Sequence, residues 1–365
     1  MGAPDPSPTG SQRVAVLLVT YDSADDLPDC LAAIARQDHR PIEVVVVDCD
    51  SRDRSVEIAR SADLGGLPRT VEPLGENRGF SGGMNAALRL TDAPFVLALN
   101  ADARPRPDFV RRLVQRAVTG GTPKVGAITG RLVRPPGADG ARRLDACGMV
   151  LIPTWRHLDR GSGELDDGRF DRAERVFGGT GAATLYRRDA LDDVAFADGE
   201  IFDSLFFAYR EDAELAFRLQ ERGWECLYEP TAIAEHRRRV VPANRSELPP
   251  AINYHSLKNR YLLRAYHQTA GNALRTLAPT LLRDLLALGY VLLRERSSWP
   301  AYSWLWRHRR TILERRRFVQ RRRTAPPEAI DRWFRTDALP LESDSPWSVS
   351  LTDEPETPSR RLGAS

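Results

Sequence analysis

The stretch Leu97-Ala98-Leu99-Asn100-Ala101-Asp102 decides how the fold is read, because an apolar run ends there in a carboxylate. The five apolar residues 95–99 predict a buried parallel strand. Asp102 then lies at the carboxyl edge of the sheet, where ligands of open α/β sheets bind. A carboxylate at that edge can hold Mg²⁺ or Mn²⁺ against a diphosphate, since both ions accept oxygen ligands. The alternative role for such an acid is a helix cap or a turn.

Similar apolar runs on both sides of this strand alternate with helical patterns. We expect buried strands at 14–19 and 42–47 and a short strand at 70–72. Apolar residues at helical spacing predict intervening helices, which we place after Ser23 and at 54–60, 80–90 and 107–118. This alternation over about 120 residues predicts a doubly wound, mostly parallel sheet.

The second half of the chain has shorter and less regular patterns. Strands are expected at 125–132, 150–152, 182–186, 225–228 and 232–234, with a helix at 212–222. From Asn253 onward the pattern is helical and basic. We therefore predict an α/β domain over residues 13–240, with halves 13–120 and 121–240, followed by a helical extension over 241–323. We expect the Pro/Gly/Ser-rich segment 1–12, which has no signal-peptide core, and the tail 324–365 to be disordered.

Charge is distributed unevenly along the 365 residues. The net charge is only +3, yet residues 236–323 carry about twenty Lys and Arg against about four Asp and Glu. Such asymmetry indicates a polyanionic partner, which can be a membrane surface, a nucleic acid or an acidic substrate. The four cysteines are far apart and lack a CxxC spacing, so a reduced, cytoplasmic compartment fits better than a disulfide scaffold.

The most apolar segment, residues 273–293, is interrupted by Arg275, Arg283 and Asp284. A spanning helix needs about twenty mostly apolar residues. The Leu/Arg pattern therefore predicts an interfacial amphipathic helix, at the inner face of a membrane, rather than a transmembrane one. Packing of this helix on its own catalytic domain is an equally open alternative.

Polar residues follow the predicted strands at three neighbouring places, namely Thr20, Asp48 and the pair Asn100 and Asp102. Their carboxyl ends would line one crevice, where an ionised Asp48 could accept hydrogen bonds from a base or ribose; a turn is its alternative role. The glycine-rich stretch 77–85 could bring backbone N–H groups close to phosphate. The absence of GxGxxG after the first strand and of GxxxxGK[ST] argues against dinucleotide-binding and P-loop domains.

Two further places carry chemistry. Glu211 and Asp212 open an amphipathic helix, where acids commonly complement the helix dipole. The functional alternative makes Asp212 a general base that takes a proton from an attacking hydroxyl. His236 follows a short strand and could be a metal ligand or a structural histidine.

Together these pieces resemble the family 2 inverting glycosyltransferases with a GT-A fold, especially the rhamnosyltransferase-like branch. Residues 19–22 look like the opening V-[ST]-Y-N, with Asp22 in place of Asn, and residues 46–53 resemble VVDNxSxD. Residues 77–85 look like NxGFxxGxN, and residues 99–102 resemble the LNxD form of the metal-binding DXD motif. Residues 177–183 with Arg187-Arg188 are similar to an acceptor-side strand, and Glu211-Asp212 to the catalytic ED pair. The resemblance covers about residues 13–240.

The resemblance implies an inverting transfer from a nucleotide-diphosphate sugar to a hydroxyl of a glycan or lipid-linked acceptor. The half 13–120 would bind the donor, which we expect to be dTDP-rhamnose first and a UDP-hexose next, and the half 121–240 would bind the acceptor. Asp212 would be the base, Glu211 would orient the acceptor or support Asp212, and Asp102 with His236 would hold Mg²⁺ or Mn²⁺. The implied acceptor-side residues are Gly179, Thr180 and Gly181. The implied donor-binding residues are Thr20, Tyr21, Asp48, Ser51, Asn77, Gly79, Phe80, Asn85, Asn100 and Ala101.

The resemblance also implies a role in polysaccharide or cell-wall biosynthesis and leaves the oligomeric state open. A different class of function remains as the alternative, namely a non-catalytic nucleotide-binding protein whose basic extension binds nucleic acid or a membrane. We expect no nucleic-acid partner, because no helix-turn-helix, zinc or RRM signature accompanies the arginines.

Overall fold

The computed structural model describes residues 12–119, 124–137, 139–238, 249–334 and 349–350. The strands are β1 (Val14–Thr20), β2 (Ile42–Asp48), β3 (Arg69–Pro73), β4 (Phe95–Leu99), β5 (Ala103–Pro105), β6 (Val125–Val133), β7 (Leu144–Ala146), β8 (Met149–Ile152), β9 (Arg156–Asp159), β10 (Glu174–Val176), β11 (Ala183–Arg187), β12 (Glu225–His236) and β13 (Val349–Ser350).

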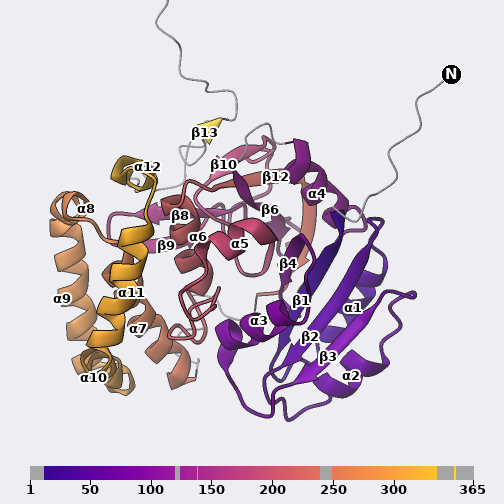
Figure 1. Cartoon of the computed structure of the whole chain (residues 1–365), viewed down its shortest axis with the longest axis horizontal. Helices are drawn as coiled ribbons and strands as arrows, with labels where there is room; N and C mark the ends of the chain where they lie inside the picture. Colours follow the sequence, from indigo (N-terminus) through magenta and orange to yellow (C-terminus); the bar gives the residue numbers. More distant parts are fainter. Residues whose placement is uncertain (1–11, 120–123, 138, 239–248, 335–348, 351–365) are drawn as a thin grey trace, which may run out of the picture.

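The helices of the α/β body are α1 (Leu27–Ala35), α2 (Ser55–Ser61), α3 (Gly79–Arg89), α4 (Phe109–Thr119), α5 (Arg188–Val194) and α6 (Glu211–Glu221). The C-terminal helices are α7 (Pro250–His267), α8 (Ala270–Arg275), α9 (Leu277–Leu293), the 3-10 helix η3 (Arg296–Ser298), α10 (Pro300–Arg307), α11 (Arg309–Arg322) and α12 (Pro327–Asp331). In Figure 1 these C-terminal helices gather on one side of the molecule, away from α1 and α2.

The core of the fold is an eleven-stranded sheet in the order β13-β10-β12-β6-β11-β4-β1-β2-β3, with β5 added on β12 and β7 on β6. The four strands β3, β2, β1 and β4 are parallel, as the sequence predicts, and β11 runs antiparallel between β4 and β6. The chain leaves β1 toward β2 and later returns to the other side of β1 as β4. Ligands of open α/β sheets bind at such a change of direction, which here lies at the carboxyl ends of β1 and β4.

Both faces of the parallel part are covered by helices, so the expected doubly wound arrangement is confirmed. Helices α1, α2 and α4 share one buried cluster with the side chains of β1 that point to their face. Helices α3, α5 and α6 share a second cluster with the alternate side chains of β1 and β2. Near-continuous β-branched residues in β2 suit a strand that is buried on both faces.

A third buried cluster joins the C-terminal helices to the α/β body. It combines Trp155 beside the β8–β9 hairpin, Phe217 of α6, Tyr266 of α7 and Trp333 beyond α12. Helix α12 and the buried Trp333 lie in the segment that we expected to be a disordered tail, and they are ordered because their apolar side chains complete this cluster. Most of that tail, like residues 1–11, lies outside the described residues.

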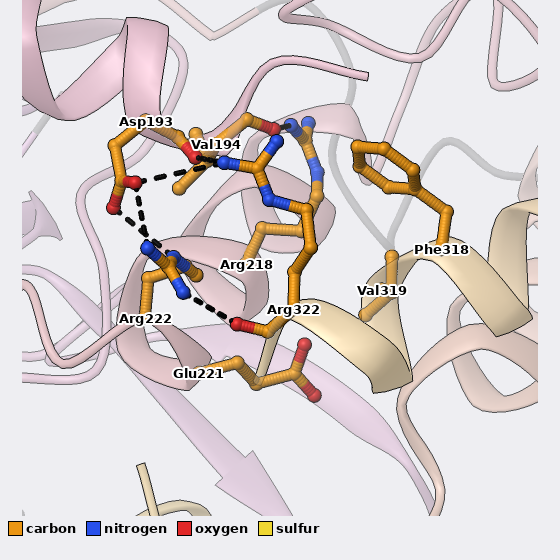
Figure 2. A pocket seen from close by; sticks show the side chains of 8 residues that line it. All are labelled: Asp193, Val194, Arg218, Glu221, Arg222, Phe318, Val319 and Arg322. Atoms are coloured by element: carbon orange, nitrogen blue, oxygen red, sulfur yellow. Dashed lines mark hydrogen bonds and ion pairs between the residues drawn. The ribbon is translucent and has the colours of Figure 1, made fainter. Parts of the chain in front are cut away.

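The end of α11 is bound to α5 and α6 by arginines (Figure 2). Arg322 donates to the backbone oxygen of Asp193 at 2.7 Å, and Arg222 of α6 donates to the Asp193 carboxylate at 2.8 Å. Arg222 also donates to the backbone oxygen of Arg322 at 2.6 Å. The basic character of α11 thus serves internal contacts at this point.

Two details of the sheet differ from the expectation. The strands expected at 225–228 and 232–234 form one strand, β12, with a register irregularity between Glu229 and Ile233. The unexpected strand β5 pairs with the C-terminal end of β12.

None of the described helices is long and apolar enough to cross a bilayer.

Candidate active site

The first polar group at this edge of the sheet is built by β1 and β2. Their parallel register places Thr20 directly beside Asp48. The Thr20 hydroxyl donates to Asp48 Oδ2 at 2.7 Å, and Ser51 donates from its backbone N–H to Oδ1 at 2.9 Å and from its hydroxyl to Oδ2 at 2.5 Å. Asp48 is buried, while Tyr21 is exposed at the same edge. Through these contacts Asp48 joins the end of β1 to the loop that follows β2. Few acceptor positions of its carboxylate remain for a base or ribose.

The glycine-rich stretch packs tightly against the protein itself. Asn77 accepts a hydrogen bond from Gly79 N–H at 2.9 Å, and Gly79 has a φ of +66°, which favours glycine. A Cβ at Gly79 would collide with the backbone oxygen and the ring of Phe207, and a Cβ at Gly83 would lie 2.6 Å from Val19. The close approach that these glycines allow is therefore to protein, where the sequence suggested phosphate.

Asn85 holds the loop in front of α6. Its amide oxygen accepts from the backbone N–H groups of Ile201 and Phe202 at 3.1 and 2.9 Å, and its amide nitrogen donates to Phe202 O at 2.6 Å. Phe80 packs edge-on against the Phe202 ring at 6.1 Å. These contacts give Asn85 a structural role at this loop.

Asp102 and His236 are brought together by strand pairing. β5 pairs antiparallel with β12 so that Ala103 lies opposite His236. His236 Nε2 consequently lies 3.1 Å from Asp102 Oδ1, and both side chains are largely buried. Ala101 is also buried, and Asn100 donates its backbone N–H to Ala182 O at 2.9 Å, which ties this strand end to the loop before β11.

Behind His236 a chain of charged groups leads deeper into the protein. His236 Nδ1 lies 2.7 Å from Asp145 Oδ2, Arg238 Nε lies 2.7 Å from Asp145 Oδ1, and the Arg238 guanidinium reaches Asp159 at 2.5 Å. Burial opposes the protonation of His236, but its contacts with Asp102 and Asp145 outweigh burial and raise its pKa to about 9. The Asp145 carboxylate thus orients the ring with Nε2 toward Asp102.

A divalent cation fits the pair Asp102 and His236. Octahedral coordination at about 2.1 Å places neighbouring ligand atoms about 3 Å apart, which matches the separation of Asp102 Oδ1 and His236 Nε2. A carboxylate that orients the metal-binding histidine, as Asp145 does, is the usual outer partner of such a ligand. No group of three or more His, Cys, Asp or Glu side chains arranged to hold a metal occurs in the described part of the chain, so further ligands would come from phosphate or water.

Asp212 sits at the start of α6 with both carboxylate oxygens oriented by backbone groups. Gly181 N–H donates to Oδ2 at 2.8 Å, and Ala213 N–H donates to Oδ1 at 2.8 Å. Burial raises the pKa of Asp212, the Gly181 N–H opposes this shift, and the charge of Asp159 adds to it. A positioned carboxylate with a raised pKa is suited to accept a proton.

Glu211 is the more deeply buried member of the acidic pair. Burial and the neighbouring charge of Asp212 raise the pKa of Glu211 well above its usual value. No hydrogen-bond partner for Glu211 Oε2 occurs among the described residues. A neutral Glu211 beside an ionised Asp212 avoids two adjacent negative charges at the start of α6.

The loop with the expected acceptor-side residues lies close enough to α6 for the hydrogen bond from Gly181 N–H to Asp212. A Cβ at Gly178 would lie 2.5 Å from the Cβ of Ala216, so only glycine lets the loop reach the helix. Thr180 accepts from the Thr184 hydroxyl at 2.7 Å through its backbone oxygen, and a Cβ at Gly179 would collide with the same threonine. The three expected acceptor-side residues, Gly179 to Gly181, therefore form one loop over the N-terminus of α6.

The loop that precedes the acidic pair has an unusual backbone. Phe207, Tyr209 and Arg210 have φ values of 66°, 71° and 73°, which cost about 1–3 kcal/mol each in residues other than glycine. Asn259 of α7 holds this loop, since its amide nitrogen donates to the backbone oxygens of Phe206, Ala208 and Tyr209 at 2.8, 2.8 and 2.6 Å. Helix α7, expected to belong to the extension, thus supports the site directly.

Sequence reasoning missed Asp145, Asp159 and Asn259. Asp145 lies on a three-residue strand that contacts His236 across 91 positions of sequence, a pairing that no local pattern reveals. His157, which lies 3.3 Å from the Arg210 guanidinium, was missed for the same reason. Asn259 occurs in the helical, basic pattern that begins at Asn253, but nothing in that pattern identifies this side chain.

Comparison with known proteins agrees with this geometry. A family model described as glycosyl transferase family 2 matches residues 15–195. The chain is 28% identical over 246 residues to N-acetylglucosaminyl-diphospho-decaprenol L-rhamnosyltransferase of Mycobacterium tuberculosis, which covers 61% of this chain and 75% of that protein.

Two solved structures share the fold. GalNAc-T7, crystallised with UDP, GalNAc and Mn²⁺, superposes with a TM-score of 0.52 at 13% identity and covers 69% of this chain and 48% of that one. TarS of S. aureus superposes with a TM-score of 0.51 at 16% identity and covers 80% and 47%. The chain thus spans about half the length of these two structures. Residues 15–195 belong to glycosyl transferase family 2, and the chain is a glycosyltransferase with the GT-A fold.

Proposed function

We propose that this glycosyltransferase transfers a sugar from a nucleotide-diphosphate sugar to a hydroxyl of a glycan or lipid-linked acceptor, with inversion at the anomeric carbon. The observation that carries the proposal is the placement of Asp212. Its two oxygens are oriented by Gly181 and Ala213 at the start of α6, and the neighbouring loop is tied through Ala182 to the strand end that leads to Asp102. The proposed base, Asp212, and the carboxylate proposed to face the diphosphate, Asp102, are therefore linked through hydrogen-bonded neighbours.

In the proposed reaction, Asp212 takes the proton of the acceptor hydroxyl as its oxygen attacks the anomeric carbon. The bond from that carbon to the diphosphate oxygen breaks on the opposite face, and the electron pair leaves with the nucleoside diphosphate. This single displacement inverts the configuration and needs no covalent intermediate on the enzyme. Burial and the charge of Asp212 raise the pKa of Glu211, which favours a single negative charge on the acidic pair.

Asp102 and His236 are the residues that would hold Mg²⁺ or Mn²⁺. A bound divalent cation offsets the negative charge that develops on the departing diphosphate. Asp145 supports this role from behind, because it orients the His236 ring and leaves Nε2 facing Asp102. The raised pKa of His236 means that a cation must displace a proton from Nε2 before it can bind there.

The donor would lie along the carboxyl ends of β1, β2 and β4. The exposed Tyr21 and the group formed by Thr20, Asp48 and Ser51 would border its nucleoside, while Asn100 and Ala101 would border its diphosphate. The similarity to a rhamnosyltransferase supports dTDP-rhamnose as the first donor to test, with UDP-hexoses next. The same relative acts on a lipid-linked glycan precursor, as its name states, which supports an acceptor of that class.

The alternative function, a non-catalytic protein whose basic extension binds nucleic acid, fits the structure less well. Many arginines of that extension contact other groups of the protein. Arg315 pairs with Asp198 and Glu200, and Arg316 donates to backbone oxygens at the end of α7. A helix whose arginines are engaged in this way offers fewer of them to phosphates.

The test is thermal stabilisation by dTDP-rhamnose, UDP-glucose, UDP-galactose and UDP-N-acetylglucosamine, each with and without Mn²⁺ or Mg²⁺. We expect one nucleotide to raise the melting temperature in a metal-dependent way, and Asp102→Asn to abolish the metal dependence. Asp63→Asn, an exposed acid in a loop before β3, is the matched control and should behave as wild type. If no nucleotide stabilises the wild-type protein, the proposed donor class is wrong.

A further inference from the structure

Helix α9 turns its apolar side away from the protein. Eight of its leucines are exposed, and six of them have more than half of their surface open to solvent. The exposed leucines are Leu277, Leu281, Leu282, Leu285, Leu286, Leu288, Leu292 and Leu293. A helix on the surface of a water-soluble domain normally has the opposite orientation, and a contiguous apolar surface of this kind marks an interaction site.

The inward side of α9 explains why this orientation is stable. Thr280 donates to the backbone oxygen of Pro153 at 3.1 Å, and Asp284 accepts from Arg260 and Arg264 of α7, both at 2.6 Å. Val291, seven residues after Asp284, is buried in a small cluster with Leu257 and Ala301. These positions repeat at helical spacing, so polar contacts and one small cluster hold the helix and leave the leucines outside.

The end of α9 carries the side chains that suit a lipid headgroup region. Arg294 and Arg296 follow the last leucines and are exposed, and Tyr290 and Trp299 are half exposed beside them. Tyrosine and tryptophan favour the boundary between water and hydrocarbon, where arginine reaches anionic phosphates. The charge that would meet these phosphates is therefore next to the apolar surface.

Exposed charge over the whole region is predominantly positive. Between residues 270 and 323, all of which the structure describes, Glu314 is the one exposed acidic residue. Seven exposed arginines follow α9: Arg294, Arg296, Arg307, Arg309, Arg310, Arg317 and Arg321. An apolar face with positive charge beside it complements an anionic lipid surface better than a second copy of itself, whose arginines would repel.

We propose that the outer face of α9, extended by Arg294, Arg296 and Trp299, docks this protein on an anionic phospholipid surface. The helix would lie in the plane of the interface, because its 17 residues and the inward Asp284 exclude a spanning orientation. The biological use of this docking rests on the proposed function, since a lipid-linked acceptor is presented at such a surface.

A chain of contacts connects the docking face to the catalytic loop. Asp284 of α9 is bound to Arg260 and Arg264 on α7, and Asn259 of the same helix holds the backbone before Glu211 and Asp212. Figure 1 shows α7 between α9 and the α/β body. Docking through α9 would therefore fix the acceptor side of the site relative to the lipid surface.

The test uses the full chain and vesicles of phosphatidylcholine, with and without phosphatidylglycerol, in a flotation assay at two salt concentrations. We expect binding to the anionic vesicles that weakens with salt and is much weaker on pure phosphatidylcholine. The triple variant Leu282→Glu, Leu285→Glu, Leu286→Glu should lose about tenfold or more in affinity. These side chains are exposed, so the variant should keep the wild-type melting temperature.

Two further variants sharpen the result. Val118→Glu with Leu165→Glu places charge on two exposed apolar residues of the α/β body and should leave vesicle binding unchanged. Arg294→Gln with Arg296→Gln should weaken anionic binding by roughly fivefold per arginine and leave the weak binding to neutral vesicles unchanged.

The outcomes distinguish a lipid surface from a second copy of this chain as the partner of the outer face of α9. If the wild-type protein is a dimer in sedimentation that the leucine variant splits, and vesicles are not bound, α9 is an interface between copies and the proposal is overturned. Equal, salt-insensitive binding to neutral vesicles would overturn the anionic part. Stabilisation by the nucleotide sugar reports the proposed function separately, because the α9 variants should retain it whether or not vesicles bind.

Discussion

The two sides of the active site are held in place by different means. On the proposed donor side, Thr20 and Asp48 end the parallel strands β1 and β2, Asp102 follows β4, and β5 brings His236 beside Asp102. On the acceptor side, Asp212 follows a loop with three unfavourable backbone conformations, and one side chain of α7, Asn259, binds three of its backbone oxygens. The donor side is thus part of the rigid sheet, while the acceptor side depends on a helix added after the α/β domain.

This difference predicts that substitutions can impair turnover and donor binding separately. A change that loosens the acceptor side should lower turnover and leave donor binding intact, because no strand end moves. A change behind His236 should weaken metal-dependent donor binding and leave the acceptor loop in place. Variants that affect both sides equally would show that the site behaves as one unit and would break the comparison.

The largest effect is expected for Asp212→Asn, which removes the proposed base but preserves the shape of the side chain. The turnover number should fall by about 10²–10⁴, the usual contribution of general base catalysis. Donor affinity, measured by thermal stabilisation with the nucleotide sugar, should stay at the wild-type value. In the wild-type protein the rate should fall on acidification at a pH above the ordinary range of an aspartate, since the pKa of Asp212 is raised.

Near-normal transfer by Asp212→Asn with intact donor binding would contradict the assignment of the base. Retention of the acidic limb in the pH profile of the variant would point to another group, and Asp159 would be the next candidate because its charge acts on Asp212.

The next effect concerns the donor side. Asp145→Asn keeps a side chain of the same size but weakens the contact that orients the His236 ring. We expect the Mn²⁺ concentration needed for half of the donor-dependent stabilisation to rise by about 10–100-fold, as for other partners of metal-binding histidines. Asp166→Asn, which removes a buried ion pair with Arg131 away from the site, is the matched control. An equal loss of metal response in both variants would show that only general destabilisation was measured.

A smaller effect on the rate is expected for Asn259→Ala on the acceptor side. The variant leaves three backbone oxygens of the loop without their donor, which should lower the free energy of unfolding by about 1–3 kcal/mol. Part of this loss allows the strained loop to leave its productive conformation, so turnover should fall by about tenfold at unchanged donor affinity. Asn272→Ala removes another buried asparagine, in α8, whose side-chain amide donates to Asp331, and should lower stability without lowering turnover.

The sequence predicts the two sides of the site to different extents. The positions of Thr20, Asp48, Asp102 and Asp212 could be predicted because each lies at the end of a strand or the start of a helix, where local periodicity is informative. The contact between His236 and Asp145 depends on the irregular register of β12 and on a three-residue strand, and neither has a local signature.

Single residues show what a local pattern does not reveal. Asn85 was assigned to the donor because its motif is associated with donor binding, but its amide is engaged by the loop at Ile201 and Phe202, 116 and 117 positions away. The leucines of α9 gave an amphipathic pattern, yet the pattern does not say which face is outside. That was decided by Asp284, whose partners lie on α7.

The smallest effect on the rate is expected for Glu211→Gln, and it is the sharpest test of charge on the acceptor side. If Glu211 is protonated in the folded protein, the amide replaces a neutral carboxyl group and turnover should stay close to the wild-type value. Stability should differ with pH, because the pKa of Glu211 is raised on folding from its ordinary value of 4.5. Above that value the unfolded chain releases the proton while the folded chain retains it.

The stability of the wild-type protein should therefore lose up to about 1.4 kcal/mol per pH unit through Glu211 as the pH rises above 4.5 toward the folded-state pKa, a loss that Glu211→Gln does not have. Glu214→Gln gives the opposite sign, because contacts with Arg218 and His267 outweigh burial and lower the pKa of Glu214. Its carboxylate stabilises the fold above 4.5 and loses this effect on acidification. Urea unfolding of the three proteins measures the Glu214 slope below pH 4.5 and the Glu211 slope above it. Parallel curves for wild type and Glu211→Gln would mean that Glu211 is ionised in the folded state, and the acidic pair would then carry two charges instead of one.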